Sequence, residues 1–177
     1  MSIQSLPPLP DLVIMILAAL LLTLSPVAQD HPPAHAMPGE EPVEPYKVDA
    51  ANAGATPFAG EGMARAFHGQ PGIRRIVDRF VATNFADRHI GEVFANHDQV
   101  RLKRTLFEHF CYILNAGCSY TGRDMLNAHK TMGVQQGDMN RLVENLQAAM
   151  GAEGVAFAAQ NRFLAKLAPM RHDIVER

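Results

Sequence analysis

The chain has 177 residues, of which 47% are hydrophobic and 19% are charged, and its formal net charge is −2. This length suits one ordinary domain with an appendage, and the apolar content is sufficient for a buried core. The balance of charges argues against a nucleic-acid-binding protein, because such proteins usually carry a basic face. Two cysteines are too few for a disulfide-rich scaffold or a multi-cysteine zinc protein.

The composition changes near residue 57. Residues 1–57 hold 10 of the 12 prolines, and Lys47 is their only basic residue. Residues 58–177 hold the other 15 lysines and arginines and the other two prolines. We therefore expect a folded domain over residues 58–177, preceded by a Pro-rich flexible linker over residues 29–57.

The segment before this linker contains an apolar run from Leu12 to Leu24. The run has the length of a signal-peptide core and falls short of the ~20 residues that a membrane-spanning helix needs, unless it is extended to Ala28. We interpret residues 1–28 as a signal peptide or membrane anchor, with membrane attachment through residues 12–28. The expected protein is exported, either periplasmic or membrane-anchored. If the run is not a signal but a buried helix of the fold, a cytoplasmic protein is expected.

The first helical pattern of the domain runs from Ile73 to Phe85, where apolar residues recur every three or four positions. Pro71 precedes this stripe, and its fixed φ suits a helix start. A second stripe runs from Leu102 to Leu114, with Asp98 as its expected N-cap and an end near Gly117. Both patterns predict amphipathic helices.

Three further helices are expected in the remainder of the domain. A short helix is predicted from Arg123 to Lys130. Asp138 is the expected N-cap of a longer helix that ends before Gly151, and a last helix from Val155 to Leu167 ends before Pro169. No segment shows the alternation of a strand. Five or six unequal helices in about 120 residues indicate an all-α fold that is not a simple bundle.

Histidine is the residue from which we expect the chemistry of the domain. The sequence has no Gly-rich phosphate loop, no nucleophile elbow and no metalloprotease motif. His129 lies on the predicted short helix and shares a face with Met125 and Met132. A neutral imidazole among soft apolar groups can hold a haem iron as the only protein ligand. The alternative is a partly buried histidine with a backbone partner.

Several motifs of the domain belong together as a set. The most specific is Tyr120-Thr121-Gly122 followed by His129 at the observed spacing. The others are Gly69–Ile73, Val77–Phe80, Phe94, Arg101–Lys103, Arg123–Met125, Ala128–Val134 and Arg171–Val175. With these motifs, about 110 of the 177 residues resemble a group I truncated haemoglobin. The resemblance implies a truncated, two-over-two globin fold around haem b (iron protoporphyrin IX).

The resemblance also implies which residues hold haem. His129 matches the proximal iron ligand, and Phe94 matches the phenylalanine that packs on the haem face. Arg101, Lys103 and Tyr120 match positions that reach the propionates, where charge-assisted hydrogen bonds are favourable. The alternative for the two cations is a solvated surface charge. The other matching haem contacts are Phe80, Val81, Leu102, Leu106, Phe110, Met125, Val134, Leu142 and Leu146.

The distal side departs from the family pattern, in which a tyrosine and glutamines hydrogen-bond bound oxygen. Val81, Leu102 and Leu106 stand at the matching places, and none of them donates a hydrogen bond. We therefore expect weaker retention of O₂ relative to CO, and easier oxidation of the iron. His109 lies on the same helix as the two leucines. It is either a distal donor or sixth iron ligand, or a residue that caps or solvates the helix surface.

Cys111 and Cys118 lie late in the distal helix and just beyond its end. An oxidising compartment permits a disulfide between them, which would join the helix end to the loop before Tyr120. The alternative is two buried thiols, and the geometry of the fold decides between the two.

Three functions are compatible with a haem held by His129. The first is reversible binding of O₂, CO or NO, which the apolar distal residues favour. The second is a haem enzyme (a nitric oxide dioxygenase, a nitrite reductase or a peroxidase-like catalyst), which needs a distal donor and an electron donor, here unidentified. The third is a six-coordinate electron carrier or sensor with His109 on the iron. A fourth hypothesis, without haem, is an interaction domain that kept the fold.

Overall fold

A computed structural model describes residues 36–176 of the chain. The predicted signal or anchor over residues 1–28 and the first part of the predicted linker lie outside these described residues. Among the helices of residues 36–176, none is both long enough and apolar enough to cross a membrane.

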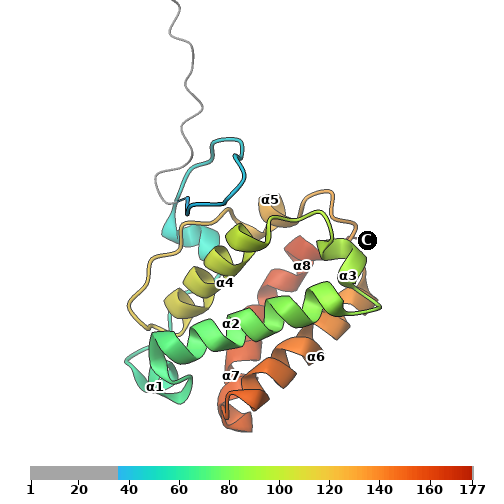
Figure 1. Cartoon of the computed structure of the whole chain (residues 1–177). Coiled ribbons are helices and arrows are strands. Elements are labelled where there is room, and N and C mark those ends of the chain that lie inside the picture. Colours follow the sequence, from blue (N-terminus) through green and yellow to red (C-terminus); the bar gives the residue numbers. More distant parts are fainter. Residues whose placement is uncertain (1–35, 177) are drawn as a thin grey trace, which may run out of the picture. The chain divides into compact units, whose positions relative to one another are not determined.

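The described residues form helices and no strands, as Figure 1 shows. Two of the helices are 3₁₀ helices, η1 and η2. In chain order the elements are η1 (Ala50–Ala53), α1 (Gly62–Ala66), α2 (Gly69–Ala86), α3 (Gly91–Phe94), α4 (Gln99–Ile113), α5 (Met125–His129), α6 (Gln136–Ala152), α7 (Phe157–Leu167), η2 (Ala168–Met170) and α8 (Arg171–Ile174).

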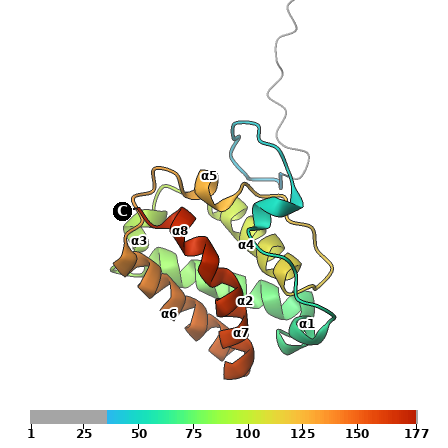
Figure 2. The ribbon, with the colours of Figure 1, turned by 180° about the vertical axis from the view of Figure 1, so that it is seen from behind.

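Two pairs of long helices form the two-over-two arrangement. Helix α2 packs against α4 on one side and α6 on the other, and α6 packs in turn against α7. Figures 1 and 2 show the same arrangement from opposite sides, with the short α5 and α8 near one another. The arrangement follows from the apolar stripes, because each long helix has to bury its stripe against another helix. The predicted all-α, truncated globin fold is confirmed.

The centre of the fold is a cluster of aromatic and aliphatic side chains. The Phe110 ring from α4 lies 5.0 Å from the Phe163 ring of α7, and Phe163 lies 5.2 Å from Phe67. Ile73 and Val81 of α2 are fully buried in the same cluster. This core connects both helix pairs. Other residues of α2 and α4 border a cavity.

The ends of the helices largely follow their predicted caps. Asp98 accepts hydrogen bonds from the backbone N–H groups of Val100 and Arg101 and so caps α4 as expected. Asp138 is different: it is the third residue of α6, and its carboxylate accepts from the backbone N–H of Gln135 in a capping box. The prediction of Asp138 as N-cap is therefore wrong by three residues, because the N-cap is Gln135. Both positions of a capping box carry polar side chains, so the sequence alone does not distinguish them.

Five short elements had no predicted counterpart. Helices α1, α3 and α8 have five, four and four residues, and η1 and η2 have four and three. Segments of this length show too few repeats of an apolar stripe to be recognised in a sequence. Gly151 lies inside α6 and not beyond its end. Tertiary packing, and not local sequence preference, sets these boundaries.

Residues 40–57, which we call the N-terminal segment, pack against the globin helices. Ala53 of η1 is completely buried, and the N–H of Phe58, just after the segment, donates to the carbonyl of Ile113 in α4. Figures 1 and 2 both show the segment beside α4 and the loop before α5. The expected flexible linker over residues 29–57 is therefore wrong for residues 40–57. Composition shows that the segment is Pro-rich, but it does not show which groups elsewhere bind its polar atoms.

Cys111 and Cys118 form a disulfide, with Cα atoms 5.5 Å apart. Of the two alternatives for these cysteines, the structure has the crosslink. It joins the end of α4 to the loop that leads to Tyr120.

Substitution of Gly72 by alanine is expected to destabilise the fold by about 2–4 kcal/mol. Gly72 lies in α2, where an added Cβ would stand 2.2 Å from the backbone oxygen of Phe67. Gly137→Ala in α6 is the matched control, because a Cβ there meets nothing within 4 Å. Urea unfolding of both variants measures the difference. Equal free energies of unfolding for the two would contradict the close packing of α1 on α2.

Removal of the disulfide is expected to cost about 2 kcal/mol of unfolding free energy, as chain entropy predicts for so short a loop. The comparison is urea unfolding of the wild type with and without dithiothreitol. A double variant, Cys111→Ala with Cys118→Ala, should match the reduced wild type and not respond to the reductant. A wild type that does not respond to the reductant either would show that the crosslink does not form.

Candidate functional site

A cavity of about 380 Å³ lies among α2, α3, α4, α5, α6 and α8. Most of its lining is apolar, and it collects residues from both helix pairs. Eleven of the residues that the sequence singled out line it: Phe80, Phe94, Arg101, Leu102, Leu106, His109, Tyr120, Met125, His129, Val134 and Leu142. The cavity is thus where the predicted haem contacts meet.

His129 is the last residue of α5, which the side chain of Asp124 caps at its start. The Nδ1–H of His129 donates to the carbonyl of Met125 at 2.8 Å. In the neutral ring this leaves Nε2 as the unprotonated nitrogen. Burial lowers the pKa of His129 below its ordinary value, and the nearby His97 acts in the same direction, whereas the bond to Met125 opposes it. The site therefore holds a neutral imidazole with its lone pair on Nε2.

Apolar side chains and one hydroxyl form the wall that α2 and α4 contribute. Phe80, Leu102 and Leu106 line the cavity there. Thr105 also lines it, but its hydroxyl donates to the carbonyl of Arg101 at 2.9 Å. A hydroxyl has one proton to donate, so this wall offers a small ligand no free donor from these four side chains.

His109 lies in this cavity and is 6% exposed. Its Nε2 is 2.8 Å from the carbonyl oxygen of Ala53, which only accepts, so this nitrogen carries the ring proton. Its ring lies 5.1 Å from that of Tyr120. Burial lowers the pKa of His109 to about 4, with the Ala53 bond opposing and His129 adding to the shift. The ring is therefore neutral at pH 7, and its only proton is already donated.

The two cations predicted for the propionates have carboxylate partners of their own. Arg101 lines the cavity, but it pairs with Asp98 at 3.1 Å and with Glu40 at 3.8 Å. Lys103 does not line the cavity and pairs with Asp78 of α2 at 3.2 Å. The hydroxyl of Tyr120, also predicted to reach a propionate, donates to a backbone carbonyl at 2.8 Å.

Three further predicted contacts belong to the core and not to the lining of the cavity. Val81, Phe110 and Leu146 are at most 4% exposed and pack in the central cluster. Val81 follows Phe80 by one position, and this step of one residue along α2 turns its side chain away from the cavity.

Several lining residues were not predicted. Arg123 belongs to the motif that begins with Tyr120-Thr121-Gly122, and this motif is the signal that could have indicated it. Val43 and Tyr46 come from the N-terminal segment, and no local pattern indicates them. Others that were not predicted to contact haem are Ile90, Val93, His97, Asp98, Thr105, Ala128, Met132, Asp138, Met139 and Ile174.

The sequence pattern of the bacterial-like globins matches residues 65–176, well over half of the chain. The protein belongs to this family. The fold of this globin is also similar to solved structures. The truncated hemoglobin from Tetrahymena pyriformis, in the Fe(III) form, is 23% identical with a TM-score of 0.62, and the match covers 65% of this chain and 98% of that one.

A second similar structure is the 2/2 hemoglobin from a Synechococcus species, solved in the cyanomet state with covalently attached heme. It is 19% identical with a TM-score of 0.59, over 65% of this globin and 98% of that chain. At this identity both likenesses concern the fold. No curated protein matches the chain significantly.

Membership of the family implies haem b as the cofactor, and the residues present fit it. A haem site needs one axial donor with a free lone pair and apolar walls for the macrocycle. Nε2 of His129 has the free lone pair that such a donor needs, because the other ring nitrogen is engaged by Met125. Phe80, Phe94 and Leu142 are among the apolar lining residues.

Acid should destabilise the apoprotein partly through His109. The pKa of His109 is about 4 in the fold, against 6.5 ordinarily, so the unfolded chain binds this proton first as the pH falls. Stability from the neutral ring is complete above pH 6.5 and is lost towards pH 4, by about 3 kcal/mol in all. Urea unfolding from pH 7.5 to 4.5 should show a steeper loss for the wild type than for His109→Gln. Parallel curves would exclude this contribution.

Proposed function

We propose that this globin holds haem b through His129 and reversibly binds a diatomic gas (O₂, CO or NO) in an apolar distal pocket. Haem, when bound, would supply an iron that can coordinate a diatomic gas. The observation that carries the proposal is the hydrogen bond from Nδ1 of His129 to the Met125 carbonyl. It orients the ring and leaves Nε2 free in a cavity lined by apolar side chains.

The distal wall favours gas binding over chemistry on the gas. Leu102, Leu106 and Phe80 exclude water but donate no hydrogen bond, and the proton of His109 is held by the carbonyl of Ala53. A polarised O₂ gains from a donor, whereas CO gains little from one. We therefore infer a low preference for O₂ over CO and ready oxidation of the iron.

The two other haem functions find less support in these contacts. A dioxygenase or peroxidase-like enzyme needs a distal donor, whereas the protons of Thr105 and His109 are already donated to backbone carbonyls. A six-coordinate carrier needs His109 on the iron, but that would require breaking the bond to Ala53 or ligation through the other ring nitrogen. An electron donor as partner, export and membrane attachment through residues 12–28 stay predictions from the sequence.

Absorption spectra of the purified protein test the proposal, in ferric, dithionite-reduced and CO-bound forms. We expect a Soret band, a five-coordinate ferrous spectrum and full conversion with CO. His129→Gly should lose the ferrous spectrum of the wild type and regain it with added imidazole. His89→Ala is the matched control, because His89 is exposed and does not line the cavity.

Two outcomes would count against the proposal. A Soret band in His129→Gly that equals that of the wild type without imidazole would exclude His129 as the ligand. A six-coordinate ferrous spectrum with split visible bands would exclude an open distal position and make His109 the first residue to replace.

A further inference from the structure

We propose that the N-terminal segment is part of the haem site, and that it holds Arg123 as the cation that binds a haem carboxylate. The inference rests on the proposed function, because it concerns the same cavity. The family match begins at residue 65, so neither the segment nor its contacts follow from membership of the family. The segment contributes Val43 and Tyr46 to the lining of the cavity.

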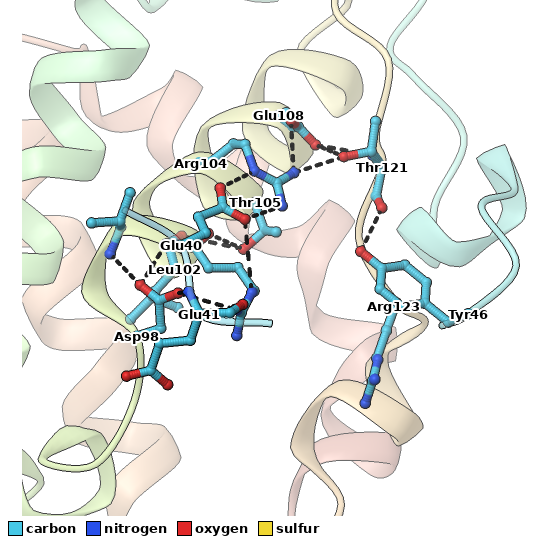
Figure 3. Close-up of polar contacts among 12 residues, drawn as sticks. Glu40, Glu41, Tyr46, Asp98, Leu102, Arg104, Thr105, Glu108, Thr121 and Arg123 are labelled. Carbon is cyan, nitrogen blue, oxygen red and sulfur yellow. Dashed lines mark hydrogen bonds and ion pairs between the residues drawn. The ribbon is translucent and has the colours of Figure 1, made fainter. Parts of the chain in front are cut away.

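A buried ion pair anchors the segment. Both carboxylate oxygens of Glu40 accept from the guanidinium of Arg104, and the two side chains are 1% and 6% exposed. Arg104 also donates to Glu108 at 3.0 Å and to the hydroxyl of Thr121 at 2.7 Å, as Figure 3 shows. Burial alone raises the pKa of Glu40, but the bonds and charge of Arg104 bring it below its ordinary value. The segment is thus held in one place by a fully partnered buried pair.

Further along the segment, Glu44 and Tyr46 contact Arg123. Its guanidinium donates to the carbonyl of Glu44 at 2.8 Å and lies 5.0 Å from the centre of the Tyr46 ring. The hydroxyl of Tyr46 donates to the carbonyl of Thr121 at 2.9 Å, which holds the ring in place (Figure 3). These contacts orient the guanidinium but leave its charge without an anion.

Arg123 differs in this respect from the cations that the family pattern suggested. Arg101 and Lys103 each have a carboxylate partner within 3.2 Å. Within residues 36–176, Arg123 forms no ion pair, although it lines the cavity. A cofactor with two carboxylates therefore finds one cation at the cavity whose charge is uncompensated.

A preorganised cation binds its anion more tightly than a mobile one, because less side-chain entropy is lost on binding. Charge-assisted hydrogen bonds are also the stronger ones. The N-terminal segment is consequently expected to slow the release of haem, and to do so through Arg123.

The test is the rate at which the full-length ferric holoprotein gives up haem to excess apomyoglobin, followed by the Soret band. Arg123→Gln should release haem roughly tenfold faster than the wild type, the loss expected for one charge-assisted hydrogen bond. Tyr46→Leu should also accelerate release, since it removes the ring that supports the guanidinium. Arg88→Gln is the matched control, an exposed cation that does not line the cavity, and should leave the rate unchanged.

Haem dimethyl ester separates carboxylate binding from a merely structural role of Arg123. With this ester, the wild type, Arg123→Gln and Tyr46→Leu should release the cofactor at the same rate. Two results would overturn the inference and leave the proposed function intact. One is a tenfold faster release of the ester from Arg123→Gln than from the wild type, and the other is an equal rate of release of natural haem from the two proteins. A wild type that takes up no haem at all would overturn both.

Discussion

The buried guanidinium of Arg104 joins three parts of this globin that lie far apart in the sequence. A charge that is 6% exposed is stable only if its hydrogen-bond donors are all engaged. Here Glu40 comes from the N-terminal segment, Glu108 from the same helix, and Thr121 from the loop before α5. The position of that loop sets where α5 begins, and α5 carries His129. His129, the proposed haem ligand, and the N-terminal segment thus both lie next to contacts of the same cation.

Each of two histidines in the cavity has one ring nitrogen engaged by a backbone carbonyl, and the apolar wall residues Phe80, Leu102 and Leu106 donate no hydrogen bond. Met125 engages one nitrogen of His129, and Ala53 engages one nitrogen of His109. In both cases a backbone carbonyl selects the tautomer, so the ring nitrogen that remains is an acceptor or a metal ligand and not a donor. The proposed gas binding without strong preference for O₂ rests on these two hydrogen bonds.

The contacts of the N-terminal segment move the start of the domain to before residue 58, where the composition of the sequence had placed it. These contacts show that the packed part of the chain begins before the part that matches the bacterial-like globins, since Ala53 is buried in the core and Val43 and Tyr46 line the cavity. A Pro-rich composition with few cations is typical of a linker, but this segment has partners for its acidic and aromatic side chains. Glu40 and Tyr46 are examples of residues whose role depends entirely on what they meet.

The sequence by itself determined the helical class, the main helices, the family resemblance and the position of His129, because these follow from apolar periodicity, caps and a motif of fixed spacing. It also placed Leu102 and Leu106 on the distal wall. Only the tertiary structure decided that Val81, Phe110 and Leu146 belong to the core, that Arg101 and Lys103 already have partners, and that Cys111 meets Cys118. The physical reason is that ion pairs, crosslinks and the direction of a side chain at the edge of a stripe depend on groups brought together by folding, which local spacing does not encode.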